Sequence, residues 1–326
     1  MVRIEVAATL DHAVVDRVRA LLDDVTRLEG HPPVGEHKYA HLAAGATDWT
    51  GALAYDGDVL VGYAHIRWNA PGARPRAAAE VVVRPDRADC EQLALRLLDA
   101  TRALVARTGG GLLYLWVRHV TDARTTLAAR AGFTVQRELL LMTRKLPDRP
   151  AVPTPPEGVV LRTYRPGEDD DEVLRVNNAA FAEHPEQGGW DRAMLAERRA
   201  LRWFSAEGLI LAWRGADLLG FHWTKWHGHD ADEVPDAAHE PVGEVYVLAV
   251  DPAAQRLGLG RTLLAAGLAH MHDRGCRQAI LYVDAAHHGP VALYRSAGFA
   301  TDHMEVCYEE QVPPAVAAPD DLLRPA

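Results

Sequence analysis

The sequence predicts an α/β protein with mixed (α+β) sheets, built from two similar domains in tandem. Three observations lead to this fold class. The chain has 326 residues, which is more than one ordinary hydrophobic core holds and fits two domains of common size. A proline-rich segment, Leu146–Pro156, divides it near the middle. Strand and helix signals then repeat in the same order on both sides of that segment.

The first half begins with a strand over 2–6 and an amphipathic helix over 11–29. A hairpin follows, and its turn at Asp56-Gly57-Asp58 carries the Gly and Asp residues that tolerate positive φ. Four further elements are expected: an apolar strand ending at Arg84-Pro85, a long helix, a strand containing Leu113-Tyr114, and a short helix that stops at Ala131-Gly132-Phe133.

The second half repeats this order, with a strand over 159–163, a helix over 169–181 and a hairpin turning at 214–217. The same four elements follow: a strand ending at Asp251-Pro252, a long helix, a strand containing Leu281-Tyr282, and a short helix that stops at Ala297-Gly298-Phe299. Because several anchors stay in register, including both Ala-Gly-Phe endings, the pattern indicates a duplication.

Domain boundaries follow from the prolines. A proline lacks an amide donor and disfavours helix, so we expect the central segment to be an extended tether. The predicted parts are an N-terminal domain over 1–146, a linker over 147–157, a catalytic domain over 158–312 and a disordered tail over 313–326.

Composition favours a cytoplasmic enzyme that acts on a small molecule. Hydrophobic and charged contents of 48% and 25% are typical of a globular protein, and no run approaches the roughly 18 apolar residues of a membrane span. The first residues, Met-Val-Arg-Ile-Glu-Val, lack the apolar core of a signal peptide. A net charge of −10 argues against nucleic acid or an anionic membrane as a partner. We expect a monomer.

Neither a disulfide framework nor a metal site is indicated. The three cysteines are widely spaced and show no metal or redox spacing. Four histidines lie close together in the second half, at His222, His227, His229 and His239, but their spacing matches no zinc motif.

An apolar strand over 245–250 runs into a glycine-bearing turn that opens a helix. The first N–H groups of a helix are unpaired, and the positive end of its dipole lies behind them, so such a turn binds anions. Gly258 and Gly260 permit close approach of the backbone, while Arg256 and Arg261 add positive charge. We therefore predict a pyrophosphate-binding turn. Its counterpart in the first half lacks glycine and carries acidic residues, Asp89 and Glu91, which would repel phosphate.

The wider pattern is more specific. Gln255-x-x-Gly258-x-Gly260 follows a Val-Asp-Pro strand end and precedes Leu-Tyr-Val-Asp and Ala-Leu-Tyr-Arg-Ser-Ala-Gly-Phe. Together these motifs resemble the acetyl-CoA signature of the GCN5-related N-acetyltransferase family. The resemblance implies two tandem domains of that fold, with acetyl-CoA as co-substrate and no metal.

The resemblance also implies which residues bind acetyl-CoA. The strand before the turn is expected to splay from its neighbour, so that backbone groups of Leu248, Ala249 and Val250 bind the pantetheine arm. The turn would cradle the pyrophosphate with Gln255, Arg256, Leu257, Gly258, Leu259, Gly260 and Arg261. His287, where the family usually has Asn, and Ala292 complete the expected set. In the first half Val81, Val82 and Val83 would hold acetyl-CoA non-productively, although the acidic turn argues against this.

Acetyl transfer to an amine requires a proton acceptor and an acid for the departing thiolate. Glu244 lies just before the cofactor strand, so we predict that it is the base. Tyr294 matches the family residue beside the sulfur of CoA, so it is the candidate acid. Because the first half lacks a usable turn, we expect catalysis in the second half only.

The acceptor is suggested by a narrower resemblance. The segment Leu174–Trp190 ends in His-Pro-Glu-Gln-Gly-Gly-Trp and is similar to tandem-domain members of the family that acetylate the amine of a cysteine joined to glucosaminyl-inositol. This implies a thiol-bearing pseudodisaccharide as acceptor, contacted by Glu36, Glu186, Lys225, Glu244 and Tyr282. Two alternatives stay open: an enzyme of the same family that acts on another amine, such as a peptide N-terminus or an aminoglycoside, and a non-catalytic acyl-CoA-binding regulator.

Overall fold

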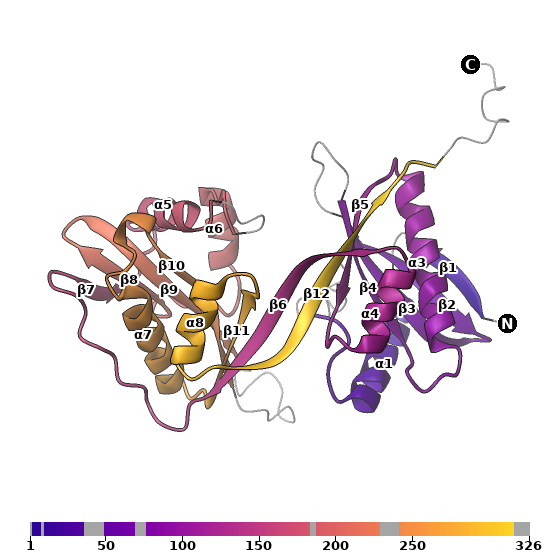
Figure 1. Cartoon of the computed structure of the whole chain (residues 1–326), viewed down its shortest axis with the longest axis horizontal. Helices are drawn as coiled ribbons and strands as arrows, with labels where there is room; N and C mark the ends of the chain where they lie inside the picture. The colour runs from indigo at the N-terminus through magenta and orange to yellow at the C-terminus, as the bar shows by residue number, and fades with distance from the viewer. Residues whose placement is uncertain are drawn as a thin grey trace, which may run out of the picture. The chain divides into compact units, whose positions relative to one another are not determined.

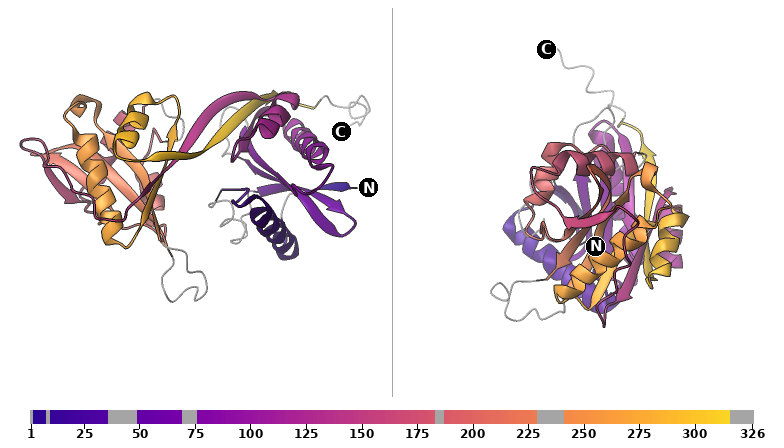
Figure 2. Two further views of the ribbon diagram at one scale, coloured as in Figure 1. Left: turned by 60° about the horizontal axis from the view of Figure 1, so that its bottom comes forward. Right: turned by 90° about the vertical axis from the view of Figure 1, so that its left-hand side faces the viewer.

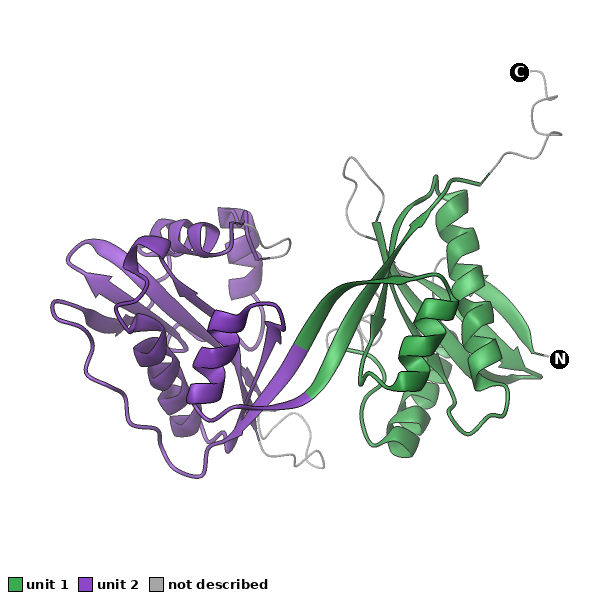
Figure 3. Ribbon diagram, in the orientation of Figure 1, with its two compact units in different colours: residues 1–139, 303–326 green, residues 140–302 purple. Residues whose placement is uncertain are grey.

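A computed structural model describes residues 2–7, 10–35, 49–68, 76–182, 187–228 and 241–315. The chain divides into two compact units, coloured separately in Figure 3. Unit 1 contains residues 1–139 and 303–326, and unit 2 contains residues 140–302. Each unit is a mixed sheet with helices on both faces, so the predicted α/β fold class is confirmed.

In unit 1 the strand order is β1-β2-β3-β4-β5-β12. Neighbouring strands are antiparallel except for the parallel pair β4–β5. Helix α1 covers one face of this sheet, and α3 and α4 cover the other (Figures 1 and 2). The elements are β1 (Arg3–Ala7), α1 (His12–Glu29), β2 (Trp49–Asp56), β3 (Val59–Trp68), β4 (Arg76–Val83), α3 (Cys90–Arg107), β5 (Gly111–Val117), α4 (Asp122–Arg130) and most of β12 (Ala300–Val312).

Unit 2 has the strand order β6-β11-β10-β9-β8-β7. Its strands β10 and β11 form a parallel pair, like β4 and β5 of unit 1. Helices α7 and α8 cover one face and α5 and α6 the other (Figure 1). The elements are the end of β6 (Thr134–Lys145), β7 (Val160–Thr163), α5 (Asp170–Ala180), α6 (Arg192–Arg199), β8 (Leu209–Arg214), β9 (Asp217–His227), β10 (Val242–Val250), the 3-10 helix η1 (Pro252–Ala254), α7 (Leu259–Asp273), β11 (Gln278–Asp284) and α8 (His288–Ser296).

The repeat predicted from the sequence is present in the structure. Both hairpins turn where expected, between β2 and β3 and between β8 and β9. Both short helices end in the same way, because Gly132 and Gly298 adopt left-handed φ values of 85° and 84° after an Ala C-cap. The matching Ala-Gly-Phe sequences thus encode matching helix ends.

Each unit is completed by a strand from the other half of the sequence. Strand β12 belongs to the second half, yet Val306–Val312 pair with Val117–Gly111 of β5 in unit 1. Strand β6 belongs to the first half, yet its last residues lie in unit 2, where Met142 is fully buried. Figure 3 shows both strands changing colour along their length. The units therefore differ from the contiguous domains predicted over 1–146 and 158–312.

Local sequence explains the helices that frame the sheets. Helix α1 begins where the Asp11 carboxylate accepts a hydrogen bond from the Val14 N–H, and it ends at Gly30 with φ of 79°. Its buried residues recur at helical spacing: Val15, Val18, Leu22 and Val25. In unit 2, α7 packs closely on β9 at Gly267, because a Cβ there would lie 2.0 Å from the His222 ring.

The segment between β6 and β7, residues 146–159, contains neither helix nor strand. Pro313–Ala315, which the sequence assigned to a disordered tail, are placed against unit 1, where the Ala315 N–H donates to the Ala106 carbonyl. The rest of that predicted tail lies outside the described residues. Within the described part of the chain, no helix combines the length and apolar character needed to cross a membrane.

Candidate active site

Strand β10 separates from β11 part-way along its length. Their parallel pairing covers only Val242–Glu244 with Gln278–Ile280, whereas on its other side β10 stays paired with β9 as far as Val250. The backbone from Val245 to Val250 therefore has no β11 partner in the ladder, so its polar groups on that side can pair with a ligand. This is the splay that the family resemblance predicted.

A β-bulge lies at the start of this gap. The register between β9 and β10 shifts between Val245 and Val247, so Tyr246 is the extra residue. Val245 packs in the cluster under α7 and α8, and Val247 packs in the cluster with α5, although residues two apart in a strand normally share a face. Because of the bulge, the side chains of Val245 and Val247 lie on opposite faces of the sheet, at the point where β10 separates from β11.

Glu244 is the last residue of β10 paired with β11, and its side chain is only 13% exposed. One carboxylate oxygen, Oε2, lies 2.6 Å from Nε2 of His227 and 3.5 Å from Nζ of Lys225. Burial alone would raise the pKa of Glu244, but the hydrogen bond from His227 and the charge of Lys225 outweigh it and hold the pKa below its ordinary value. Glu244 is therefore ionised at neutral pH.

Tyr282 shares the sheet face of Glu244. On β11, Leu281 and Val283 point into the core under α7 and α8, so Tyr282 between them points to the opposite face, as does Ile280, which pairs with Glu244. Tyr282 is 41% exposed. The structure thus brings Tyr282, Glu244 and Lys225 to one face of neighbouring strands.

Tyr294 approaches from the opposite face. It lies in α8, is 8% exposed, and packs in the same cluster as Val245 of β10 and Val283 of β11, the strands on either side of the gap. Its ring makes an edge contact with Phe299, and among the described residues its hydroxyl has no hydrogen-bond partner. Burial raises the pKa of Tyr294, so the phenol keeps its proton at neutral pH.

The turn after β10 has the features of an anion site. Gly258 is the N-cap of α7 with φ of 81°, and no side chain caps the first N–H groups of that helix. Residues Gln255–Gly258 are exposed. Among the described residues, Arg256 and Arg261 make no ion pair, so their charges are available to a ligand. His287 is the N-cap of α8 and also makes no side-chain cap bond, and Ala292 is exposed on the same helix.

The equivalent turn of unit 1 is neutralised internally. Strand β4 also separates from β5, since their pairing stops at Ala79 and leaves Glu80–Val83 beyond it. In the turn that follows, however, Arg84 binds Asp86 and Asp24, and Arg87 binds Asp89 and Asp56. The strand geometry is therefore kept in unit 1, while the cations of the turn are already engaged by carboxylates.

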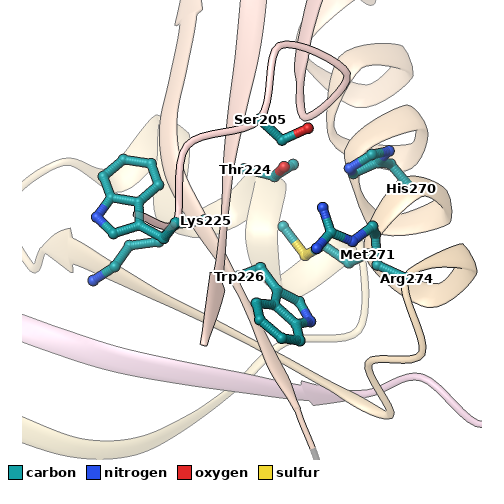
Figure 4. A pocket seen from close by; sticks show the side chains of 8 residues that line it. Ser205, Thr224, Lys225, Trp226, His270, Met271 and Arg274 are labelled. Atoms are coloured by element: carbon teal, nitrogen blue, oxygen red, sulfur yellow. The ribbon is translucent and has the colours of Figure 1, made fainter. Parts of the chain in front are cut away.

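A small pocket lies beside the site but opens to the other face of the sheet (Figure 4). Thr224 and Trp226 of β9 face His270 and Arg274 of α7 across it, while the Lys225 ammonium points away. Lys225 instead lies 5.7 Å from the centre of the Trp203 ring. The pocket is therefore separate from the carboxylate of Glu244.

Two predicted acceptor residues, Glu36 and Glu186, lie outside the described residues, as do His229 and His239. Sequence reasoning missed His227 as a partner of Glu244 and weighed it only as a metal ligand. Alternation along β9 would have placed His227 on the face of Lys225. The register of β9 against β10 could not be predicted from the sequence, because a long connection between two strands does not determine which residues pair.

Comparison with known proteins agrees with this geometry. Residues 174–299 match the model of the acetyltransferase (GNAT) family. A mycothiol acetyltransferase of Catenulispora acidiphila is 42% identical over 310 residues, covering 92% of this chain and 96% of that protein. One from Rhodococcus erythropolis is 41% identical, covering 90% and 95% respectively.

The chain belongs to the mycothiol acetyltransferase family. The predicted GCN5-related N-acetyltransferase membership and acetyltransferase activity are thereby confirmed. The fold of this acetyltransferase also occurs in a tandem GNAT protein from the clavulanic acid biosynthesis pathway, with a TM-score of 0.72, 17% identity and coverage of 97% and 100%. A GCN5-related N-acetyltransferase from Sphaerobacter thermophilus gives a TM-score of 0.71 at 18% identity, with coverage of 97% and 98%.

Proposed function

We propose that this acetyltransferase transfers the acetyl group of acetyl-CoA to the cysteinyl amine of desacetylmycothiol, giving mycothiol and CoA. The names of its relatives support the acceptor. The observation that carries the catalytic assignment is the position of Glu244, a buried and ionised carboxylate where β10 leaves β11, directly upstream of the exposed turn.

Unit 2 supplies the site for acetyl-CoA in this proposal. Its turn offers uncapped helix N–H groups and two uncompensated arginines to the pyrophosphate, and the unpaired edge of β10 offers backbone groups from Leu248 to Val250 to the pantetheine arm. In the turn after β4 of unit 1, Arg84 and Arg87 are already paired with carboxylates, so we place turnover in unit 2. Binding of acetyl-CoA at Val81–Val83 stays a prediction from the resemblance.

The amine must lose a proton, and Glu244 is the acceptor. An α-amino group has an ordinary pKa of about 7.7–8.0, so part of it is neutral near physiological pH. A carboxylate that is ionised throughout this range attracts the ammonium form, takes one proton from it and releases that proton to solvent. The neutral amine then attacks the thioester carbonyl, and the nitrogen loses a second proton as the amide forms and the C–S bond breaks. A backbone N–H on the open edge of β10 would stabilise the oxyanion during transfer.

The departing thiolate must gain a proton, and Tyr294 is the donor. Its hydroxyl keeps its proton because burial raises the pKa of Tyr294. The residue packs with Val245 and Val283 on the face of the sheet opposite Glu244, which supports a mechanism in which base and acid approach the reacting carbonyl from different sides. Lys225, Tyr282, Glu36 and Glu186 are proposed to bind the polyhydroxylated acceptor.

An acceptor panel tests the proposal. Purified enzyme is incubated with acetyl-CoA and desacetylmycothiol, free cysteine, a peptide with an N-terminal cysteine, or an aminoglycoside. CoA is quantified by chromatography, because the free thiol of the acceptor would interfere with thiol reagents. Mass spectrometry after alkylation distinguishes the amide from a thioester.

We expect kcat/KM for desacetylmycothiol to exceed that for each other amine by about 100-fold or more, since a site built to hydrogen-bond a substrate rejects analogues that lack its polar groups. The product should retain a free thiol. Equal rates with all amines would contradict the acceptor assignment, and CoA release with none of them would favour a non-catalytic regulator.

A further inference from the structure

The two neighbours of Glu244 meet at the same oxygen. His227 Nε2 is 2.6 Å from Oε2, and Lys225 Nζ is 3.5 Å from that atom. Among the described residues, no hydrogen bond to the other oxygen, Oε1, is found. One oxygen of the carboxylate is thus held by the protein, and the other is left for an incoming N–H group.

The backbone fixes the location of the His227 ring. In the antiparallel ladder Lys225 pairs with Glu244, and His227 pairs with Val242. His227 is therefore the diagonal neighbour of Glu244 on the same face, within reach of a long side chain. Its side chain is 14% exposed, close to the 13% of Glu244, so the hydrogen bond between them is shielded from water.

We propose that His227 is a positioning residue of the acetyl-transfer reaction: its ring N–H donates to Oε2 of Glu244 and aims Oε1 at the acceptor amine. The inference rests on the proposed role of Glu244 as base. Lys225 cannot supply this orientation alone, because an ammonium on a flexible stem acts as a point charge, whereas the imidazole N–H has a fixed direction.

The same bond keeps the carboxylate ionised. Among the described residues, the charged and titratable groups on the side of Glu244 are Lys225 and His227 from β9, Tyr246 from β10, beside which lies Arg198 of α6, and Tyr282 from β11. Without the His227 N–H, burial is opposed chiefly by Lys225, so the pKa of Glu244 rises. Loss of the His227 N–H should therefore shift the pH profile, whereas loss of packing contacts alone should not.

Two substitutions separate the donor from the bulk of the ring. His227→Phe keeps a ring of similar size and loses the N–H, while His227→Gln keeps an N–H donor on a flexible chain. His272→Phe is the matched control, because His272 is a histidine of α7 that lies beside Asp273, and α7 covers the sheet face opposite Glu244. For each variant we would measure kcat, KM for both substrates, the pH profile of kcat, and thermal unfolding.

We expect His227→Phe to lower kcat by about 10- to 100-fold, the usual effect of removing a partner that orients a reacting group. KM for acetyl-CoA should be unchanged, and the acid limb of the profile should move to higher pH. His227→Gln should recover part of both effects, and His272→Phe should behave as wild type. If His227→Phe does not fold, His227→Gln is compared with wild type instead. We then expect a loss of kcat and a shift of the acid limb in the same directions, each smaller than the effect expected for His227→Phe.

A double-mutant cycle with Glu244→Gln distinguishes failure of this inference from failure of the proposed function. If His227 acts through Glu244, adding His227→Phe to the Glu244→Gln variant should not lower kcat any further. A full additional loss in that background, or a wild-type kcat and pH limb in the His227 variants, would overturn the inference. A wild-type rate for Glu244→Gln itself would overturn the function on which it rests.

Discussion

For its proposed role as the base, Glu244 combines two properties that oppose each other. Its pKa is held below the ordinary value by His227 and Lys225 against the effect of burial, which makes the carboxylate less basic. The same neighbours ensure that it is charged when the acceptor arrives. Because the α-amino group of the acceptor has an ordinary pKa of only about 7.7–8.0, little basicity is needed, and attraction of the ammonium matters more.

The substitution Tyr294→Phe, which removes only the hydroxyl group, tests the proposed acid. The hydroxyl has no hydrogen-bond partner among the described residues, so its removal should not lower the thermal unfolding temperature. We expect kcat to fall by about 100-fold, because the thiolate must then leave without a proton donor. A steady-state assay with a parallel unfolding curve measures both. An unchanged kcat in the folded variant would show that the proton comes from elsewhere.

At the scale of elements, the paired turns after β4 and β10 show what a sequence does and does not disclose. The glycines, arginines and strand end of the second turn predicted its exposed, uncapped form. Asp89 and Glu91 of the first turn predicted poor phosphate binding, and the structure adds that Asp89 binds Arg87 while Asp86 binds Arg84. The bulge at Tyr246 had no sequence signal, because it depends on the pairing of β9 with β10.

Arg256→Ala and Arg261→Ala test the turn as a unit. Each removes a cation that has no ion-pair partner among the described residues, so we expect KM for acetyl-CoA to rise about tenfold, with little change in kcat. Arg87→Ala, at the equivalent turn of unit 1, removes a guanidinium already paired with Asp89 and Asp56 and should leave this KM unchanged. A larger rise of this KM in Arg87→Ala than in Arg256→Ala would place productive acetyl-CoA binding in unit 1 and contradict the proposal.

At the scale of the whole molecule, the exchanged strands are the main feature that the sequence did not predict. Local patterns identified the strands and helices of both halves, but they carry no information on which sheet a terminal strand joins. Strand β12 buries Val306, Tyr308 and Val312 in the core of unit 1, and β6 buries Met142 in unit 2. A boundary drawn at the proline-rich segment therefore separates each unit from one of its own strands.

Splitting the chain at that segment should make the exchange visible. A fragment of residues 1–150 lacks β12 and leaves the β5 edge unpaired, and a fragment of residues 151–326 lacks β6 at the β11 edge. Unpaired edges promote aggregation. We expect each fragment alone to be insoluble and the two to copurify when produced together, as judged by size-exclusion chromatography. Two soluble fragments that fold independently would contradict this account of the units.

The most direct test of the central claim is the rate of mycothiol formation by Glu244→Gln relative to wild type at saturating acetyl-CoA. The substitution keeps the size of the side chain and its capacity to form hydrogen bonds but removes the proposed proton acceptor at the point where β10 leaves β11. We expect the rate to fall by about 100-fold or more, with acetyl-CoA affinity unchanged because the turn is intact. A rate equal to that of the wild type would contradict it.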